Sequence, residues 1–102
     1  MTLKFFYENY KLNDLDISSV YVRNNKLYIS LNMQIYLELI ANGYRPELDV
    51  ESSKVFIFNI DHQDVIIKKP YNVTRYDFSN DKLIIEMNNY LFIIENTLIE
   101  IK

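Results

Sequence analysis

The sequence is poor in the residues on which most catalytic and metal sites depend. Its 102 residues include no cysteine, one glycine, one histidine and two prolines. Without cysteine the chain has no disulfide, no thiolate nucleophile and no cysteine-ligated zinc. A single glycine also excludes a glycine-rich loop that binds phosphate groups. We therefore expect no catalytic residues, no bound metal and no cofactor.

Two polar clusters remain as candidates for chemistry, and we interpret both as turns. His62, within residues 61–64, would need a nucleophile beside it for catalysis, or several converging ligands to hold a metal. Asp14 and Asp16 could do acid–base work only if their surroundings made one an acid and the other a base. Their spacing resembles the start of a calcium loop, but the glycine and the distal glutamate of such a loop are missing. The sequence thus predicts a protein that is not an enzyme.

Long apolar runs and an excess of one charge are missing too. No stretch approaches the roughly 20 apolar residues that cross a membrane, and the apolar run before Glu8 is too short for a signal peptide. The net charge is −3, with both signs scattered along the chain, so no basic stripe attracts nucleic acid. We expect a cytoplasmic protein that binds neither membranes nor nucleic acid. Mild acidity is compatible with a basic protein partner.

What the chain does contain is an ordinary globular share of apolar residues and many asparagines. Hydrophobic residues make up 49% and charged residues 25%, and this length suits a single domain over residues 1–102. With so little glycine and proline, asparagine and aspartate must form the turns, because they tolerate left-handed backbone. The candidate turns are Asn24-Asn25, residues 61–64, Ser79-Asn80-Asp81, Asn88-Asn89 and Asn96-Thr97. The short β-rich segments between them indicate antiparallel strands.

The last third of the chain predicts a meander of three strands. If Asn88-Asn89 is a two-residue hairpin loop, apolar residues face one another across it and Lys82 lies opposite Glu95. If Asn96-Thr97 is a second such loop, the same apolar side chains share one face, which a one-residue slip would destroy. The apolar pairs are Leu83 with Ile94, Ile85 with Phe92, Ile94 with Ile99, and Phe92 with Ile101.

The first hairpin follows from the same reasoning. With Asn24-Asn25 as its loop, one face pairs Val22 with Leu27 and Val20 with Ile29, and the other face pairs Tyr21 with Tyr28 and Ser19 with Ser30. The second strand keeps its alternation through residue 39, although helical spacing leaves a helix open for residues 33–42.

Two further segments are apolar enough to be strands. Residues 54–60 are apolar on both faces, which predicts a central, covered strand, and residues 64–69 can pair with it across residues 61–63. Residues 3–10 fit an edge strand or a short helix. Together these segments predict an all-β fold, with room for one short helix. It is either an antiparallel β-sandwich or a strongly curved, barrel-like sheet built from hairpins, with a C-terminal three-stranded meander.

Tyrosines supply the candidate binding residues. Tyr21, Tyr28 and Tyr36 lie on the polar face of the first hairpin, where they either bind a partner or pack under residues 1–16 or 41–53. Tyr44 and Arg45 lie in the longest loop, where a tyrosine with an arginine is typical of an interface hot spot. These five residues are the predicted partner-binding set.

Both ends of the chain resemble a known class of proteins. Residues 13–20, Asn-Asp-Leu-Asp-Ile-Ser-Ser-Val, and residues 82–95 followed by 98–101 resemble small uncharacterised bacterial all-β proteins. Some of these are similar to immunity proteins, which are encoded beside bacterial toxins. Asn13 replaces the histidine usual before the first aspartate, and no functional residue is carried over.

Three functions are consistent with these observations. The leading hypothesis is a non-enzymatic domain that binds another protein, most concretely an immunity-type inhibitor of a bacterial toxin. The second is a small-molecule-binding β domain with a cavity between a sheet and a covering loop. The third is a structural module that homodimerises through a sheet edge.

Overall fold

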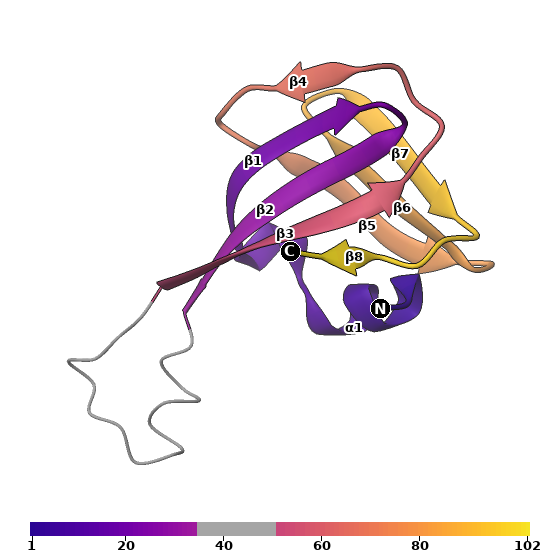
Figure 1. Cartoon of the computed structure of the whole chain (residues 1–102), viewed down its shortest axis with the longest axis horizontal. Helices are drawn as coiled ribbons and strands as arrows, with labels where there is room; N and C mark the ends of the chain where they lie inside the picture. The colour runs from indigo at the N-terminus through magenta and orange to yellow at the C-terminus, as the bar shows by residue number, and fades with distance from the viewer. Residues whose placement is uncertain (35–50) are drawn as a thin grey trace, which may run out of the picture.

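The computed structural model describes residues 1–34 and 51–102 (Figure 1). It consists of antiparallel strands and one short α-helix, as the turn and strand pattern predicts. The elements in chain order are helix α1 (Leu3–Asn9), the 3-10 turn η1 (Leu12–Asp14), and strands β1 (Asp16–Arg23), β2 (Lys26–Gln34), β3 (Glu51–Asn59), β4 (Val65–Ile67), β5 (Val73–Ser79), β6 (Lys82–Met87), β7 (Tyr90–Glu95) and β8 (Glu100–Ile101).

The strands form two sheets that enclose one core. The first sheet has the order β4-β1-β2-β3-β8 and the second the order β5-β6-β7, and in Figure 1 strands β1, β2 and β3 lie in front of β5 and β6. Alternate side chains of both sheets point inward and bury their apolar surface against one another. The largest fully buried side chains of the sheets are Leu27, Ile29, Leu31, Phe56, Phe58, Leu83, Ile85, Met87, Phe92 and Ile94, and Phe6 of α1 and Leu12 of η1 join them. This arrangement is a β-sandwich, one of the two predicted architectures.

Asparagine and aspartate form the hairpin turns, as the scarcity of glycine predicts. Three two-residue loops have positive φ at both positions: Asn24-Asn25, Asn80-Asp81 and Asn88-Asn89. Such loops match the right-handed twist of the strands they join. The predicted registers are confirmed, with Tyr21 opposite Tyr28 and Lys82 opposite Glu95. The Lys82 Nζ and Glu95 Oε2 atoms are 3.5 Å apart.

The predicted hairpin at Asn96-Thr97 is wrong. Asn96 has a φ of 54°, but Thr97 does not adopt positive φ, because a β-branched residue is strongly disfavoured there. A two-residue loop needs both positions left-handed, so the chain leaves the second sheet. Strand β8 instead pairs with β3 of the first sheet, with Ile101 opposite Phe56. The C-terminal meander is therefore β5-β6-β7, rather than β6, β7 and residues 98–101.

The predicted pairing of residues 64–69 with β3 is also wrong. Strand β4 pairs with β1, with Ile67 opposite Val20. The connection from β3 crosses the first hairpin turn, where the Ile60 N–H donates to the Asn25 carbonyl at 3.1 Å and the Asn24 N–H donates to Asp64 Oδ1 at 3.0 Å. These bonds carry the chain over the end of the hairpin to the free edge of β1. Strand β3 lies between β2 and β8, as a central strand should. Phe56 and Phe58 are buried on its inner face. On its outer face Ile57 is buried but Ser53 and Asn59 are exposed, so the predicted cover on both faces is found only in part.

The N-terminal segment forms the helix α1, one of the two conformations left open by the sequence. Thr2 caps it by accepting a hydrogen bond from the Phe5 N–H at 3.1 Å. The helix buries Leu3 and Phe6 in the core, and the Phe6 ring meets the Phe56 ring edge-on at 5.1 Å. Helix α1 therefore packs on the inner side of the first sheet.

Asn88 ties the β6–β7 turn to the segment before β5. Its side-chain Nδ2 donates to the carbonyls of Lys68 and Pro70, both at 3.0 Å, and its Oδ1 accepts from the Asn72 N–H at 2.8 Å. One side chain therefore fixes the path of residues 68–72.

Replacing Asn88 by glycine isolates these three bonds, because glycine adopts positive φ without strain. We expect Asn88→Gly to lower the free energy of unfolding by about 1–3 kcal/mol, measured by urea denaturation. The matched control is Asn89→Gly, since Asn89 has a φ of 68° and no side-chain bond to a described residue. We expect the control to change stability by less than about 0.5 kcal/mol. Equal losses in the two variants would contradict this role for Asn88.

Tyr76 ties β5 to the segment after α1. Its hydroxyl donates to the Tyr10 carbonyl at 2.7 Å, and its ring lies 5.0 Å from the Tyr7 ring. Burial raises the pKa of Tyr76 well above its ordinary value, and the nearby Tyr7 hydroxyl raises that pKa further.

This raised pKa predicts a loss of stability at alkaline pH. In the unfolded chain Tyr76 loses its proton near pH 10, whereas in the folded protein it keeps that proton to higher pH. The unfolded state then binds fewer protons, so the free energy of unfolding falls as the pH rises above about 10. We expect Tyr76→Phe to be less stable than the wild type by about 1 kcal/mol at pH 8. Between pH 9.5 and 11, the free energy of unfolding measured by urea titration should fall less steeply for the variant than for the wild type. Equal slopes for the two proteins would rule out this role for Tyr76.

Candidate functional site

The outer face of the five-stranded sheet carries a continuous apolar and aromatic row. Because side chains alternate along a strand, the residues between the core positions of β1 and β2 point away from the core. The register places Ile66 of β4 opposite Tyr21, Tyr21 opposite Tyr28, and Tyr28 opposite Ile57. We call these four residues the tyrosine ridge.

The two tyrosines stand side by side rather than flat on the sheet. Their ring centroids are 4.6 Å apart, with 18° between the ring planes. That separation is close to the spacing of neighbouring strands. The two rings therefore stand upright on their strands, and each turns one face toward the other ring. The ridge therefore offers ring edges and hydroxyl tips to solvent, and little free ring face.

The ridge combines buried and exposed apolar surface. Both tyrosines are partly buried, and Ile57 is only 5% exposed. Ile66, at the other end, is 77% exposed, the most exposed large apolar side chain among the described residues. Helix α1 packs against Phe56 and Phe58 on the opposite face, so residues 3–9 do not cover the tyrosines.

A shallow hollow of about 640 Å³ lies beside the ridge, between β1 and β4. Its lining residues are Tyr21, Val22, Arg23, Asp64, Val65 and Ile66. Most of these side chains are apolar, and Arg23 and Asp64 supply the charge. Asp64 already accepts the Asn24 N–H through Oδ1. The hollow can receive an apolar side chain next to a cation.

Arg23 and Lys26 continue the same face beyond the tyrosines. They lie directly opposite each other at the hairpin turn, each two residues along its strand from a tyrosine. Arg23 is exposed and Lys26 is partly buried. The face thus carries an aromatic pair and a cation pair in adjacent rows.

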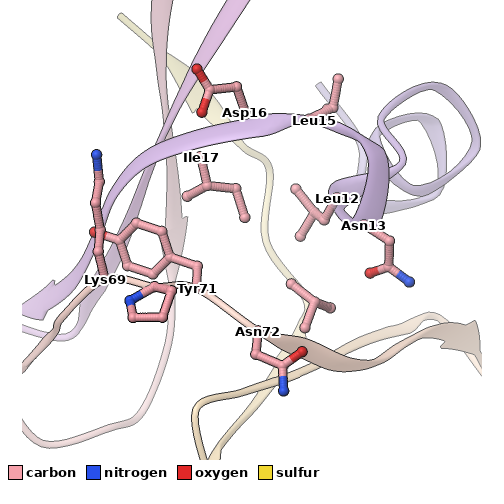
Figure 2. Close-up of a pocket in the computed structure, with 10 residues that line it drawn as sticks. Leu12, Asn13, Leu15, Asp16, Ile17, Lys69, Tyr71 and Asn72 are labelled. Atoms are coloured by element: carbon pink, nitrogen blue, oxygen red, sulfur yellow. The ribbon is translucent and has the colours of Figure 1, made fainter.

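A second hollow of about 450 Å³ separates the start of β1 from the segment before β5 (Figure 2). Leu12 and Ile17 form its buried floor, and Asp16 and Lys69 lie at its edge (Figure 2). Asp16 is exposed and accepts the side-chain amide of Asn32 at 3.2 Å. No polar side chain in the described residues is buried, so this hollow has no enclosed group to orient a small ligand.

The predicted binding residues divide into two groups. Tyr21 and Tyr28 come together as predicted and form the centre of the ridge. Tyr36, Tyr44 and Arg45 lie outside the described residues, and their assignment stays a prediction.

The polar clusters considered for chemistry lie apart from the ridge. The His62 ring packs 5.1 Å from Phe92, and its Nδ1 lies 2.7 Å from the Gln63 carbonyl. The His62 ring therefore packs against β7, whereas Asp61, Gln63 and Asp64 are exposed, as expected of a solvated segment. Asp14 and Asp16 are exposed. In residues 1–34 and 51–102, no three histidine, aspartate or glutamate side chains gather as a metal site would require.

Comparisons with other proteins give no relative. No protein-family model, no curated protein and no solved structure matches this chain. The described part of the chain also contains no helix long and apolar enough to span a membrane.

The contributors that the predicted binding set lacks differ in whether the sequence could have revealed them. Ile66 joins the ridge only because β4 pairs with β1, which the apolar pattern does not reveal. Arg23 and Lys26 follow from the hairpin register alone, and the register signal was sufficient to place them beside the tyrosines.

Substituting both tyrosines tests whether the ridge is surface or core. We expect Tyr21→Ala/Tyr28→Ala to fold and unfold cooperatively, losing about 1–2 kcal/mol of stability, because it removes one cross-strand pair. The comparison is Ile29→Ala, at a fully buried neighbouring position, which should cost about 2–5 kcal/mol by itself. Urea denaturation followed by circular dichroism measures both. A tyrosine variant that no longer folds would place these rings in the core.

Proposed function

We propose that this chain is a non-enzymatic domain that binds another protein through the tyrosine ridge. The stacked Tyr21–Tyr28 pair, with the 77% exposed Ile66 at its end, is the observation that carries the proposal. Tyrosines are enriched in protein interfaces because they supply rigid contact area with a polar tip.

The way the tyrosines are held favours tight association. A side chain that is already ordered loses little entropy on binding. The rings are ordered by stacking on each other and by their places in a five-stranded sheet. Contact with a partner would remove Ile66 from water, at about 25 cal/mol per Å² of apolar surface. The ridge thus has the composition of an interface centre.

The ring orientation favours a protein over a nucleic acid. Sheets that bind single strands offer ring faces on which bases stack. In this ridge each tyrosine directs one face to the other ring at 4.6 Å. Ring edges and hydroxyls suit the mixed apolar and hydrogen-bonding surface of a protein instead.

An immunity-type inhibitor of a bacterial toxin is the form of this function that we favour. The resemblance at residues 13–20, 82–95 and 98–101 supports it, as does a net charge of −3 for meeting a basic toxin. Such a protein acts in the cytoplasm by covering a site on the toxin, so it needs a rigid surface and no catalytic group. The two-layer sandwich provides that rigid support.

Photo-cross-linking from the ridge tests the proposal. We expect a benzoylphenylalanine at position 66 to give a covalent adduct with one protein in a lysate of the native host, identified by mass spectrometry. The adduct should be lost in Tyr21→Ala/Tyr28→Ala. The matched control carries the same group at Leu91, which is 45% exposed on the outer face of the other sheet, and it should give no such adduct.

Expression of the captured protein then tests the immunity-type form. The captured protein should stop growth when expressed alone, and co-expression of the wild-type chain should restore growth while the double tyrosine variant should not. An adduct that forms equally from both positions, or that survives the tyrosine substitutions, would count against the ridge as the binding surface.

A further inference from the structure

The cation pair beside the ridge is placed at an energetic cost. Arg23 and Lys26 are directly opposite residues of an antiparallel pair, where side chains approach to about 5 Å and like charges destabilise the sheet. An uncharged pair at these positions would avoid that repulsion.

No carboxylate among the described residues forms an ion pair with this cation pair. Three cations in residues 1–34 and 51–102 pair with carboxylates, at Lys4–Glu8, Arg75–Asp77 and Lys82–Glu95. Neither Arg23 nor Lys26 forms an ion pair within that part of the chain. Asp64 lines the same hollow as Arg23, and Asp61 and Glu95 line another hollow with Lys26. None of these three carboxylates forms an ion pair with either cation, and Glu95 pairs with Lys82 instead. Within the described residues, both cations at the hairpin end of this face are therefore available to a carboxylate of a partner.

The cations and the tyrosines can be contacted by one partner segment. Residues two apart on a strand point to the same side and lie about 7 Å apart. Arg23 therefore lies next to Tyr21, and Lys26 next to Tyr28, on one surface. A carboxylate placed between the two cations brings the neighbouring residue of the partner over the tyrosines or into the hollow beside Ile66.

We infer that the partner presents an aspartate or glutamate to Arg23 and Lys26, next to an aliphatic or aromatic side chain that packs on Tyr21 and enters the hollow. This inference rests on the proposed function and names the chemistry of its partner at that site. A guanidinium binds a carboxylate through two parallel hydrogen bonds, and charged pairs of this kind are among the strongest in interfaces. The local contact is acidic on the partner's side even if that partner is basic overall.

Selection from phage-displayed random 12-residue peptides tests this chemistry. The wild-type chain is the bait, peptides that also bind Tyr21→Ala/Tyr28→Ala are discarded, and the remaining peptides are synthesised for fluorescence anisotropy. We expect aspartate or glutamate next to leucine, isoleucine or phenylalanine in the selected peptides. Arg23→Gln/Lys26→Gln should weaken their binding about tenfold or more, since one lost charged contact is worth about one such factor.

The control for net charge is Lys11→Gln/Lys69→Gln, which removes two exposed cations away from the ridge and should change binding less than about twofold. Peptides that need the tyrosines yet bind Arg23→Gln/Lys26→Gln as well as the wild type would overturn the inference and leave the proposed function standing. Selection of no tyrosine-dependent peptide would overturn both. A labelled single-stranded 12-nucleotide probe whose binding is lost in both double variants, Tyr21→Ala/Tyr28→Ala and Arg23→Gln/Lys26→Gln, would overturn the inference in favour of nucleic acid.

Discussion

The five-stranded sheet depends on the register of the β1–β2 hairpin. Val20 and Val22 face the core opposite Ile29 and Leu27, and a shift of one residue would expose all of them. The left-handed Asn24-Asn25 turn sets this register. The same register turns Tyr21 and Tyr28 outward as a stacked pair. Burial of the inner face and formation of the candidate site are thus two results of one alignment.

A few polar contacts between distant segments complete the site. Bonds from Ile60 to Asn25 and from Asn24 to Asp64 direct the chain over the hairpin turn, so that β4 lies on the edge of β1. This pairing brings Ile66 beside Tyr21 and forms the hollow next to it. At the other end of the segment, the Asn88 side chain holds residues 68–72. Exposed hydrogen bonds of modest strength therefore position the surface on which the proposed function depends.

Sequence reasoning succeeded where the turn chemistry was local. Pairs of asparagine or aspartate tolerate left-handed backbone at both loop positions, so the turns at Asn24-Asn25 and Asn88-Asn89 predicted their registers correctly. It failed at Asn96-Thr97, where a β-branched residue cannot complete the loop and β8 joins the other sheet. Alternation alone could not separate these outcomes, because both place Ile99 in an apolar environment.

The sequence by itself determined the strand content, the two hairpin registers, and the pairing of Tyr21 with Tyr28. All of these follow from side chains and turns close together in the chain. Only the tertiary structure decided which sheet edges β4 and β8 join, and therefore that Ile66 extends the ridge. Any free strand edge offers the same backbone donors and acceptors, so the choice between edges depends on how the whole core packs and on contacts between residues distant in sequence.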